Sequence, residues 1–319
     1  MVLTLEKIRA AGERISGYAV KTPLLRLSAM DSFVGCRVYV KAECMQVTGS
    51  FKFRGAVNKA LSLTPEQLGR GIVAVSSGNH ARGISYAAKL LGAKVTVVMP
   101  LTATAIKVSN TKALGAEVIQ CENQERFKVA ERICAERGAV MVHPFNDEDI
   151  MAGQGTAGLE IAEQCPELDR LIIPISGGGL FSGVSTAVKA LAPKVKVYAA
   201  EPSALPRYTV SVKAGTPTAV PPKKTVADAL VSLIPGDKCF PCVAANADGI
   251  AAVDDEFILK GMKLLLAEGK VLCEPSSAIG IGAVLQGLIK VNPEDNVCFL
   301  ISGGNVALDQ LSILDDVVI

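Results

Sequence analysis

A lysine flanked by two phenylalanines is the part of the sequence best suited to covalent chemistry. The motif spans Ser50 to Gly55 and reads SFKFRG. Desolvation between two rings disfavours the ammonium form of Lys52, which lowers its pKa and frees the amine as a nucleophile. A free amine can form a Schiff base with an aldehyde. The alternative is an amphipathic helix start, in which Phe51 and Phe53 enter the core and Lys52 extends toward solvent.

A run of three glycines follows a later apolar segment. It lies between a predicted strand and a predicted helix and consists of Ser176, Gly177, Gly178, Gly179 and Leu180. Glycines there expose several backbone N–H groups, and the following helix directs its positive end at the loop. The sequence therefore predicts a phosphate-binding loop.

The same loop allows a second interpretation, a dinucleotide-binding turn. Gly177-x-Gly179-x-x-Ser182 nearly matches the dinucleotide fingerprint, and Glu201 closes the next strand at a distance that suits a ribose. Ser182 stands where the third glycine is required. This interpretation also leaves the lysine motif unexplained.

Another polar loop has the same strand-to-helix placement. It contains Ser76, Ser77, Gly78, Asn79 and His80. Backbone amides at the start of the following helix suit a carboxylate. His80 can instead be a core or capping histidine.

Ser302, in the segment Ser302 to Asn305, ends the last apolar run of the chain. A side chain at that strand end can meet a ligand held by the other loops. The alternative is a serine that only caps the turn.

The elements that must position these loops alternate along the chain. Strands are predicted over residues 37–41, 72–75, 94–99, 117–120, 140–142, 171–175, 196–200, 250–253 and 297–301. Helices are predicted over residues 5–15, 79–91, 105–114, 126–137, 180–191 and 254–267, after Arg54 and after Pro275. Such alternation implies right-handed crossovers and parallel sheets. Residues 202–241, rich in Pro and Lys, are predicted to be irregular.

Composition narrows the class of protein. With 319 residues, half of them hydrophobic, the chain can form about two domains. No apolar run reaches the ~18 residues that a membrane-spanning helix needs. The 33 basic and 31 acidic residues form no basic block, and 4% aromatic residues argue against a nucleic-acid surface.

Nine scattered cysteines and the absence of a secretory signal pattern favour a reducing, cytoplasmic compartment. The pair Cys239 and Cys242 lacks a second pair or neighbouring histidines. We interpret it as two incidental thiols and not as a zinc or redox site.

In their order along the chain, these motifs resemble the fold-type II pyridoxal-phosphate (PLP) enzymes, specifically the serine/threonine dehydratase and serine racemase group. The resemblance covers nearly the whole chain. It implies an α/β fold of the tryptophan synthase β type, with two open, twisted, mostly parallel sheets and helices on both faces. It also implies a large PLP-binding domain of residues 1–70 and 148–319, a small domain of residues 71–147 that closes over the substrate, and a homodimer.

The resemblance assigns roles around the cofactor. Lys52 holds PLP, the triglycine loop holds its phosphate, Asn79 bonds its 3′ oxygen and Ser302 meets the pyridine nitrogen. A serine there cannot supply the negative charge of an aspartate, which disfavours transamination and favours loss of a β-leaving group. The implied cofactor-binding residues are Phe51, Lys52, Asn79, Ser176, Gly177, Gly178, Gly179, Leu180 and Ser302.

The resemblance also assigns substrate contacts. Ser77 is the most informative residue, because many threonine dehydratases have alanine there and serine racemases have serine. Racemisation needs an acid or base on each face of the Cα carbanion. We predict Lys52 on one face and Ser77 on the other. The implied substrate-binding residues are Ser76, Ser77, Gly78, Asn79, His80, Arg126 and Ser232.

Two positions depart from the resembled group. Its racemases often hold a divalent cation with the Glu after a strand, a later carbonyl and an Asp beyond it. Glu201 is present here, but residues 202–207 contain no acidic residue, and Arg207 can occupy that space with its own charge. The sequence therefore predicts no metal ligands and at most weak cation binding. Ala229 replaces a glycine of the group, which makes its loop less permissive.

The function implied by the resemblance is PLP-dependent racemisation or dehydration of serine and threonine, giving D-serine or a 2-oxo acid plus ammonia. A threo-3-hydroxyaspartate dehydratase would use the same residues. A nicotinamide-dependent oxidoreductase and a non-catalytic sensor are more distant alternatives.

Overall fold

Six strands form the larger of two sheets in the computed structural model, which describes residues 3–319. The strand order is β1-β2-β10-β7-β8-β9, and every neighbouring pair is parallel except β1 and β2. The strands are β1 (Leu24–Arg26), β2 (Arg37–Ala42), β7 (Arg170–Pro174), β8 (Lys196–Pro202), β9 (Gly249–Val253) and β10 (Asn296–Ile301).

Both faces of this sheet are buried, as the side-chain alternation of the central strand β10 shows. Val297, Phe299 and Ile301 pack with α12 and α13, whereas Cys298 and Leu300 pack on the opposite face with α8 and α9. The helices concerned are α8 (Glu148–Gln164), α9 (Gly179–Leu191), α12 (Asp255–Ala267) and α13 (Pro275–Leu285). The loops at the ends of these strands therefore lie between the two layers of helices.

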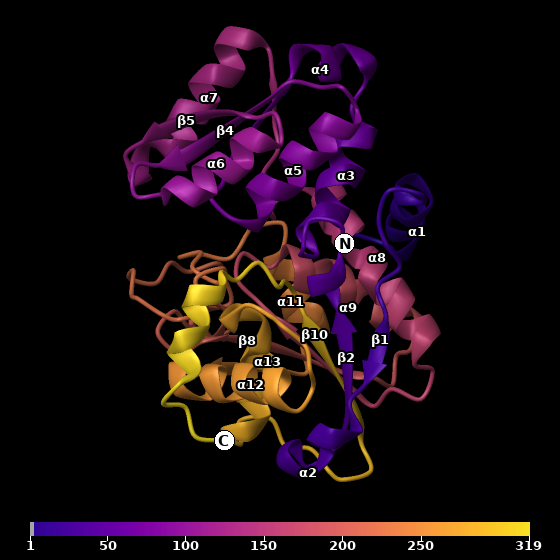
Figure 1. Ribbon diagram of the computed structural model, residues 1–319. Coiled ribbons are helices and arrows are strands. Elements are labelled where there is room, and N and C mark those ends of the chain that lie inside the picture. Colours follow the sequence, from indigo (N-terminus) through magenta and orange to yellow (C-terminus); the bar gives the residue numbers. More distant parts are fainter. Residues whose placement is uncertain (1–2) are drawn as a thin grey trace.

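A second, four-stranded sheet is entirely parallel, in the order β5-β4-β3-β6. Ile72 and Ala74 of β3 pack with α3 and α5, while Val73 and Val75 pack with α7 on the other face. Its strands are β3 (Ile72–Val75), β4 (Val95–Pro100), β5 (Glu117–Cys121) and β6 (Val140–Met141). Figure 1 shows this sheet and its helices above the six-stranded sheet.

The helices near the second sheet are α3 (Lys52–Ser62), α4 (Pro65–Arg70), α5 (Asn79–Leu90), α6 (Ala105–Ala113) and α7 (Arg126–Arg137). Elsewhere lie α1 (Leu5–Ile15), α2 (Asp31–Val34), α10 (Arg207–Ala214) and α11 (Phe240–Asn246). All predicted strands are present, with small differences at their ends. The predicted α/β class, with two open, mostly parallel sheets covered on both faces, is confirmed.

The prediction of irregular structure over residues 202–241 is wrong in part, because α10 and the start of α11 lie there. Thr and Val residues weaken the helical propensity of α10. The helix is stabilised from outside its own sequence, since Glu201 accepts hydrogen bonds from the amides of Tyr208 at 2.9 Å and Thr209 at 2.7 Å. Across residues 3–319, no helix has both the length and the apolarity needed to cross a membrane.

Candidate active site

Lys52 is the first residue of α3, and its side chain is half-buried. The amine donates a hydrogen bond to Pro144 O at 2.7 Å and lies 5.2 Å from the centroid of the Phe51 ring. Burial lowers the pKa of Lys52 to about 8. The predicted direction of the shift is therefore confirmed, and the amine is a competent nucleophile near neutral pH.

The second phenylalanine of the motif has a different surrounding from the one predicted. Phe53 is fully buried in the core, and its ring meets the Tyr86 ring edge-on with a centroid distance of 5.7 Å. Consecutive helical residues diverge by about 100° around the axis. General burial, with the Phe51 ring alongside, therefore explains the lowered pKa of Lys52 better than a sandwich between two rings.

The triglycine loop lies between β7 and α9, and its backbone leaves no room for side chains. Gly178 has a φ of +104°, and a Cβ there would overlap the Tyr208 hydroxyl. A Cβ at Gly177 would overlap the ring of Phe145, and one at Gly179 would lie 2.9 Å from Phe145 O. Only glycine fits at these positions.

Hydrogen bonds from several segments hold this loop in place. Gly177 O accepts from the Tyr208 hydroxyl and from the amide of Gly236, both at 3.0 Å. Ser176 Oγ accepts from the amide of Ser232 at 3.1 Å, so the structure brings two predicted site residues together. The first-turn N–H groups of α9 have no acceptor within the helix. The donors of the loop therefore suit the phosphate of PLP.

A short segment joins the lysine to the triglycine loop. Pro144 O accepts the hydrogen bond from Lys52, and the adjacent Phe145 packs directly on Gly177 and Gly179. The predicted nucleophile contacts Pro144 and the predicted phosphate loop contacts Phe145, so these two consecutive residues connect them in space.

Gly178→Ala is expected to lower the free energy of unfolding by about 1–3 kcal/mol more than Gly215→Ala. Both glycines have positive φ, but a Cβ at Gly215 would meet nothing within 4 Å. The control variant thus carries the backbone strain without the overlap against Tyr208. Urea unfolding of both variants measures the difference, and equal destabilisation would contradict the close packing of Gly178 against Tyr208.

The Ser76–His80 loop precedes and starts α5. Ser76 Oγ accepts from the amide of Gly78 at 3.2 Å, and Ser77 and Asn79 are half-buried. His80 is buried with Nε2 3.2 Å from Val142 O, and burial lowers its pKa to about 3. His80 is therefore a neutral imidazole in the core, as the alternative interpretation expected; a substrate contact stays a prediction.

Sequence reasoning missed the partners of Asn79. Its amide nitrogen donates to both carboxylate oxygens of Glu274 at 2.9 and 3.0 Å, and its oxygen accepts from Asn305 Nδ2 at 2.8 Å. Burial raises the pKa of Glu274. Glu274 was visible in the sequence only as the residue before Pro275 at a helix start. The network fixes the amide orientation of Asn79.

Ser302 is buried at the end of β10 and pairs with a second serine that the sequence did not single out. The Oγ atoms of Ser302 and Ser277 are 3.0 Å apart, and Ser277 also bonds both backbone groups of Gly303. Ser302 O accepts from the amide of Phe51 at 3.0 Å. The last predicted loop therefore lies directly beside the lysine motif.

Arg126 is separate from these contacts. Its Nε donates to Asn123 O at 2.9 Å, in the turn just before α7. The next residue, Phe127, stacks on His143 at 5.7 Å. The predicted substrate contact of Arg126 stays a prediction.

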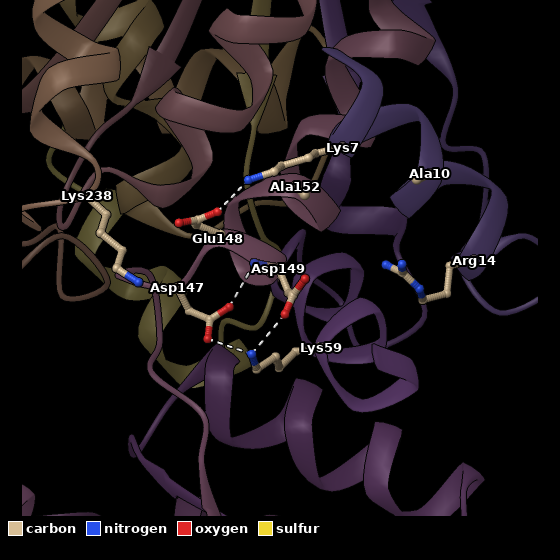
Figure 2. A pocket seen from close by; sticks show the side chains of 9 residues that line it. All are labelled: Lys7, Ala10, Arg14, Lys59, Asp147, Glu148, Asp149, Ala152 and Lys238. Atoms are coloured by element: carbon tan, nitrogen blue, oxygen red, sulfur yellow. Dashed lines mark hydrogen bonds and ion pairs between the residues drawn. The ribbon is translucent and has the colours of Figure 1, made fainter. Parts of the chain in front are cut away.

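Outside these loops, three further features of the described chain bear on possible sites. One pocket lies beside the start of α8, and Lys52 is not among the residues that line it. In it Lys59 bridges Asp147 and Asp149, both at 2.9 Å (Figure 2). Cys239 and Cys242 are buried free thiols. Within residues 3–319, no group of three or more His, Cys, Asp or Glu side chains is arranged to hold a metal ion.

Comparison with known proteins agrees with this geometry. Serine racemase from Oryza sativa subsp. indica is 41% identical over 313 residues, which cover 96% of this chain and 92% of that protein. L-threonine ammonia-lyase from Thermotoga maritima is 40% identical over 97% of this chain and 77% of its own length. The structure of maize serine racemase superposes with a TM-score of 0.94 at 39% identity, covering 98% of this chain and 97% of that one. The family model described as "Pyridoxal-phosphate dependent enzyme" matches residues 15–303, and the chain belongs to this family.

Proposed function

We propose that the protein catalyses racemisation and α,β-elimination of serine and threonine with PLP, giving D-serine or a 2-oxo acid plus ammonia. The observation that carries the proposal is the half-buried Lys52 amine beside a triglycine loop, joined to it through Pro144 and Phe145. The names of the rice and Thermotoga relatives support these two reactions.

The residues of the site fit the cofactor. The Lys52 amine would bind the aldehyde, and the loop from Ser176 to Leu180 would bind the phosphate. Asn79 would face the 3′ oxygen, and Ser302 would face the pyridine nitrogen with a neutral hydroxyl paired to Ser277. When bound, PLP accepts the electron pair left at Cα after deprotonation.

Lys52 has the properties of the general base. Its lowered pKa of about 8 leaves a useful fraction of free amine at neutral pH, and the remaining fraction returns a proton efficiently. We propose that it removes the Cα proton on its own face of the substrate. In the elimination, the β-hydroxyl leaves as one molecule of water. A second water then hydrolyses the unsaturated product to a 2-oxo acid and ammonia, so the net reaction neither gains nor loses water.

The Ser76–His80 loop is proposed to bind the substrate carboxylate. The amides at the start of α5 provide donors, and the positive end of that helix favours an anion. In this arrangement the Ser77 hydroxyl supplies the proton on the face opposite Lys52.

Ser77→Ala is expected to lower racemisation by about 10²-fold or more while elimination stays within a small factor. Only racemisation needs a proton donor on the second face. Ser76→Ala is the matched control, because Ser76 lies in the same loop and its hydroxyl holds the amide of Gly78. That control should affect both reactions alike.

The measurement uses L-serine, D-serine, L-threonine and threo-3-hydroxyaspartate as separate substrates. Chiral chromatography reports racemisation, and ammonia and 2-oxo acid release report elimination. Undiminished racemisation by Ser77→Ala would refute the assigned role. No reaction with serine or threonine, but turnover of hydroxyaspartate, would replace the proposed substrates.

The domain division and the assembly are also proposals. Residues 71–147 contain the separate four-stranded sheet, which supports a small domain, with residues 1–70 and 148–319 as the large one. An ion pair of 3.6 Å between Lys107 and Asp228 crosses from one to the other and suits closure over a substrate. Helix α3 shares a core with the small sheet, so the lysine helix would couple to that movement. A homodimer in the cytoplasm is the expected state, and nine free cysteines among the described residues are compatible with a reducing compartment.

A further inference from the structure

Arg207 is an arginine with no exposure to solvent, at the first position of α10. Its guanidinium donates to Leu205 O at 2.7 and 3.0 Å, to Leu230 O at 2.9 Å and to Ile175 O at 3.4 Å. Its Nε lies 4.0 Å from a carboxylate oxygen of Glu201, which is equally buried. One positive charge is therefore surrounded by oxygens from separate segments of the chain.

Two of these carbonyls lie at the border of the phosphate loop. Ile175 directly precedes Ser176, the first residue of that loop. Leu230 is two residues before Ser232, whose amide donates to Ser176 Oγ at 3.1 Å. Arg207 therefore ties the strand end that enters the loop to the segment that supports the loop from outside.

The neighbour of Arg207 makes a further connection. The Tyr208 hydroxyl donates to Gly177 O at 3.0 Å, and the amide of Tyr208 donates to Glu201 at 2.9 Å. On the first turn of α10, Tyr208 thus contacts the phosphate loop itself, and Arg207 contacts the residue just before it. A shift of this turn would move the loop's carbonyl groups.

The same oxygens do not suit a bound divalent cation. A hard cation binds several oxygens, preferably charged ones, and within the described residues Glu201 is the one carboxylate within 4.0 Å of the Arg207 guanidinium. Both Glu201 oxygens already accept from Tyr208 and Thr209. A cation beside Leu205 O would also meet the fixed charge of the guanidinium.

We infer that Arg207 is a built-in replacement for a bound cation, a positioning residue whose guanidinium holds the phosphate loop in its binding geometry. The protein therefore retains PLP without a divalent metal. The inference rests on the cofactor of the family and on no particular substrate, so it survives if the proposed reactions do not.

The first test is Arg207→Met, with retention of PLP by the holoenzyme as the readout. We expect PLP affinity to fall roughly tenfold or more, the scale of a lost charge-assisted hydrogen bond, with pyridoxal affinity unchanged. Pyridoxal lacks the phosphate that the loop binds, so the ratio of the two affinities isolates the loop. Absorbance of the bound cofactor reports both, under conditions where circular dichroism shows folded protein.

Arg170→Met is the matched control. Arg170 begins β7, the strand whose other end leads into the phosphate loop, and it pairs with Asp295 at 2.7 Å. This variant should lower Tm without changing the PLP-to-pyridoxal ratio. If Arg207→Met lost affinity for PLP and for pyridoxal equally, or lost none, the positioning role would be overturned.

The second test exchanges the charge. Arg207→Asp places a second carboxylate near Glu201 and Leu205 O, which should make Tm and PLP retention rise on addition of Mg²⁺ or Ca²⁺. The wild type should respond neither to these ions nor to EDTA. If the variant does not fold without a cation, refolding yield with and without Ca²⁺ replaces Tm. An unresponsive variant, stoichiometric metal in the wild type, or release of PLP by EDTA would overturn the inference.

Discussion

Lys52→Ala is expected to reduce turnover by roughly 10³-fold or more, because the proposed function assigns two roles to the Lys52 side chain: it attaches the cofactor and it moves the Cα proton. Treatment of the wild type with borohydride should bleach its visible absorbance and leave the cofactor's mass on the peptide containing Lys52. The variant should gain no mass. Spectroscopy and peptide mass spectrometry make the two measurements independent of any assumed substrate.

Lys59→Met is the matched control for Lys52→Ala. Lys59 lies on the same helix and bridges Asp147 and Asp149 (Figure 2). Its loss should affect stability and leave hydride trapping intact. Trapping at another lysine, or full activity without Lys52, would contradict the assignment and with it the proposed function.

The pKa of Lys52 gives the same prediction a pH dependence. Only the free amine attacks an aldehyde, and burial lowers the pKa to about 8. The rate at which PLP attaches to cofactor-free protein should therefore rise between pH 7 and 9 and then level off. An ordinary lysine, with a pKa of about 10.4, would give a rate that still rises above pH 10.

Local elements were predictable because their signals are local. The strand over residues 72–75 and the helix over residues 126–137 were predicted with the observed bounds. The apolar run of the strand is bounded by Gly71 and Ser76, and a left-handed Gly138 ends the helix. Their parallel pairing followed from the alternation of strands and helices.

The contacts of the site were not predictable, because they join distant residues. Asn79 and Glu274 are 195 positions apart, and Lys52 and Pro144 are 92 apart. No periodicity within either segment encodes such a pairing. The loops could be identified by their residue types, but their hydrogen-bond partners depend on how the two sheets pack.

The helix α10 illustrates the same limit at the level of secondary structure. Its β-branched residues favour extended conformations, and Glu201, at the end of β8, supplies acceptors for its first amides. The sequence showed only that residues 202–207 contain no acidic residue and that the charge of Arg207 could occupy the space of a cation. The three carbonyl groups that accept hydrogen bonds from Arg207 could be identified only from the folded structure.

Arg54→Met is expected to lower the free energy of unfolding by about 3–5 kcal/mol. Arg54 is buried two residues after Lys52, and its guanidinium contacts two carboxylates. It donates to Glu43 at 2.8 and 2.9 Å and to Glu160 at 2.7 and 2.8 Å. Glu43 has no exposure to solvent, so the variant leaves a buried carboxylate without its main counter-charge.

The loss of unfolding free energy in Arg54→Met should depend on pH, because it involves the ionisation of Glu43. Burial opposes ionisation of Glu43, yet the charge and hydrogen bonds of Arg54 lower its pKa overall. The stability it contributes is present above the unfolded pKa of about 4.3 and is lost as pH falls through the lower folded value. In Arg54→Met, the effect of burial on Glu43 is no longer offset by the Arg54 charge. The pKa of Glu43 therefore rises in the folded state, and its carboxyl group takes up a proton on folding. The deficit should therefore be largest near pH 7 and narrow toward pH 4.

Urea unfolding of the holoenzyme at both pH values measures this effect. Arg137→Met is the control, because its ion pair with Glu117 is about half exposed and should contribute at most about 1 kcal/mol. A deficit that does not change with pH would mean that lost packing, not the unpaired charge of Glu43, causes the destabilisation. Since Arg54 and Lys52 share the first turn of α3, a deficit that narrows at low pH would also show that this buried charge network stabilises the turn that carries the nucleophile.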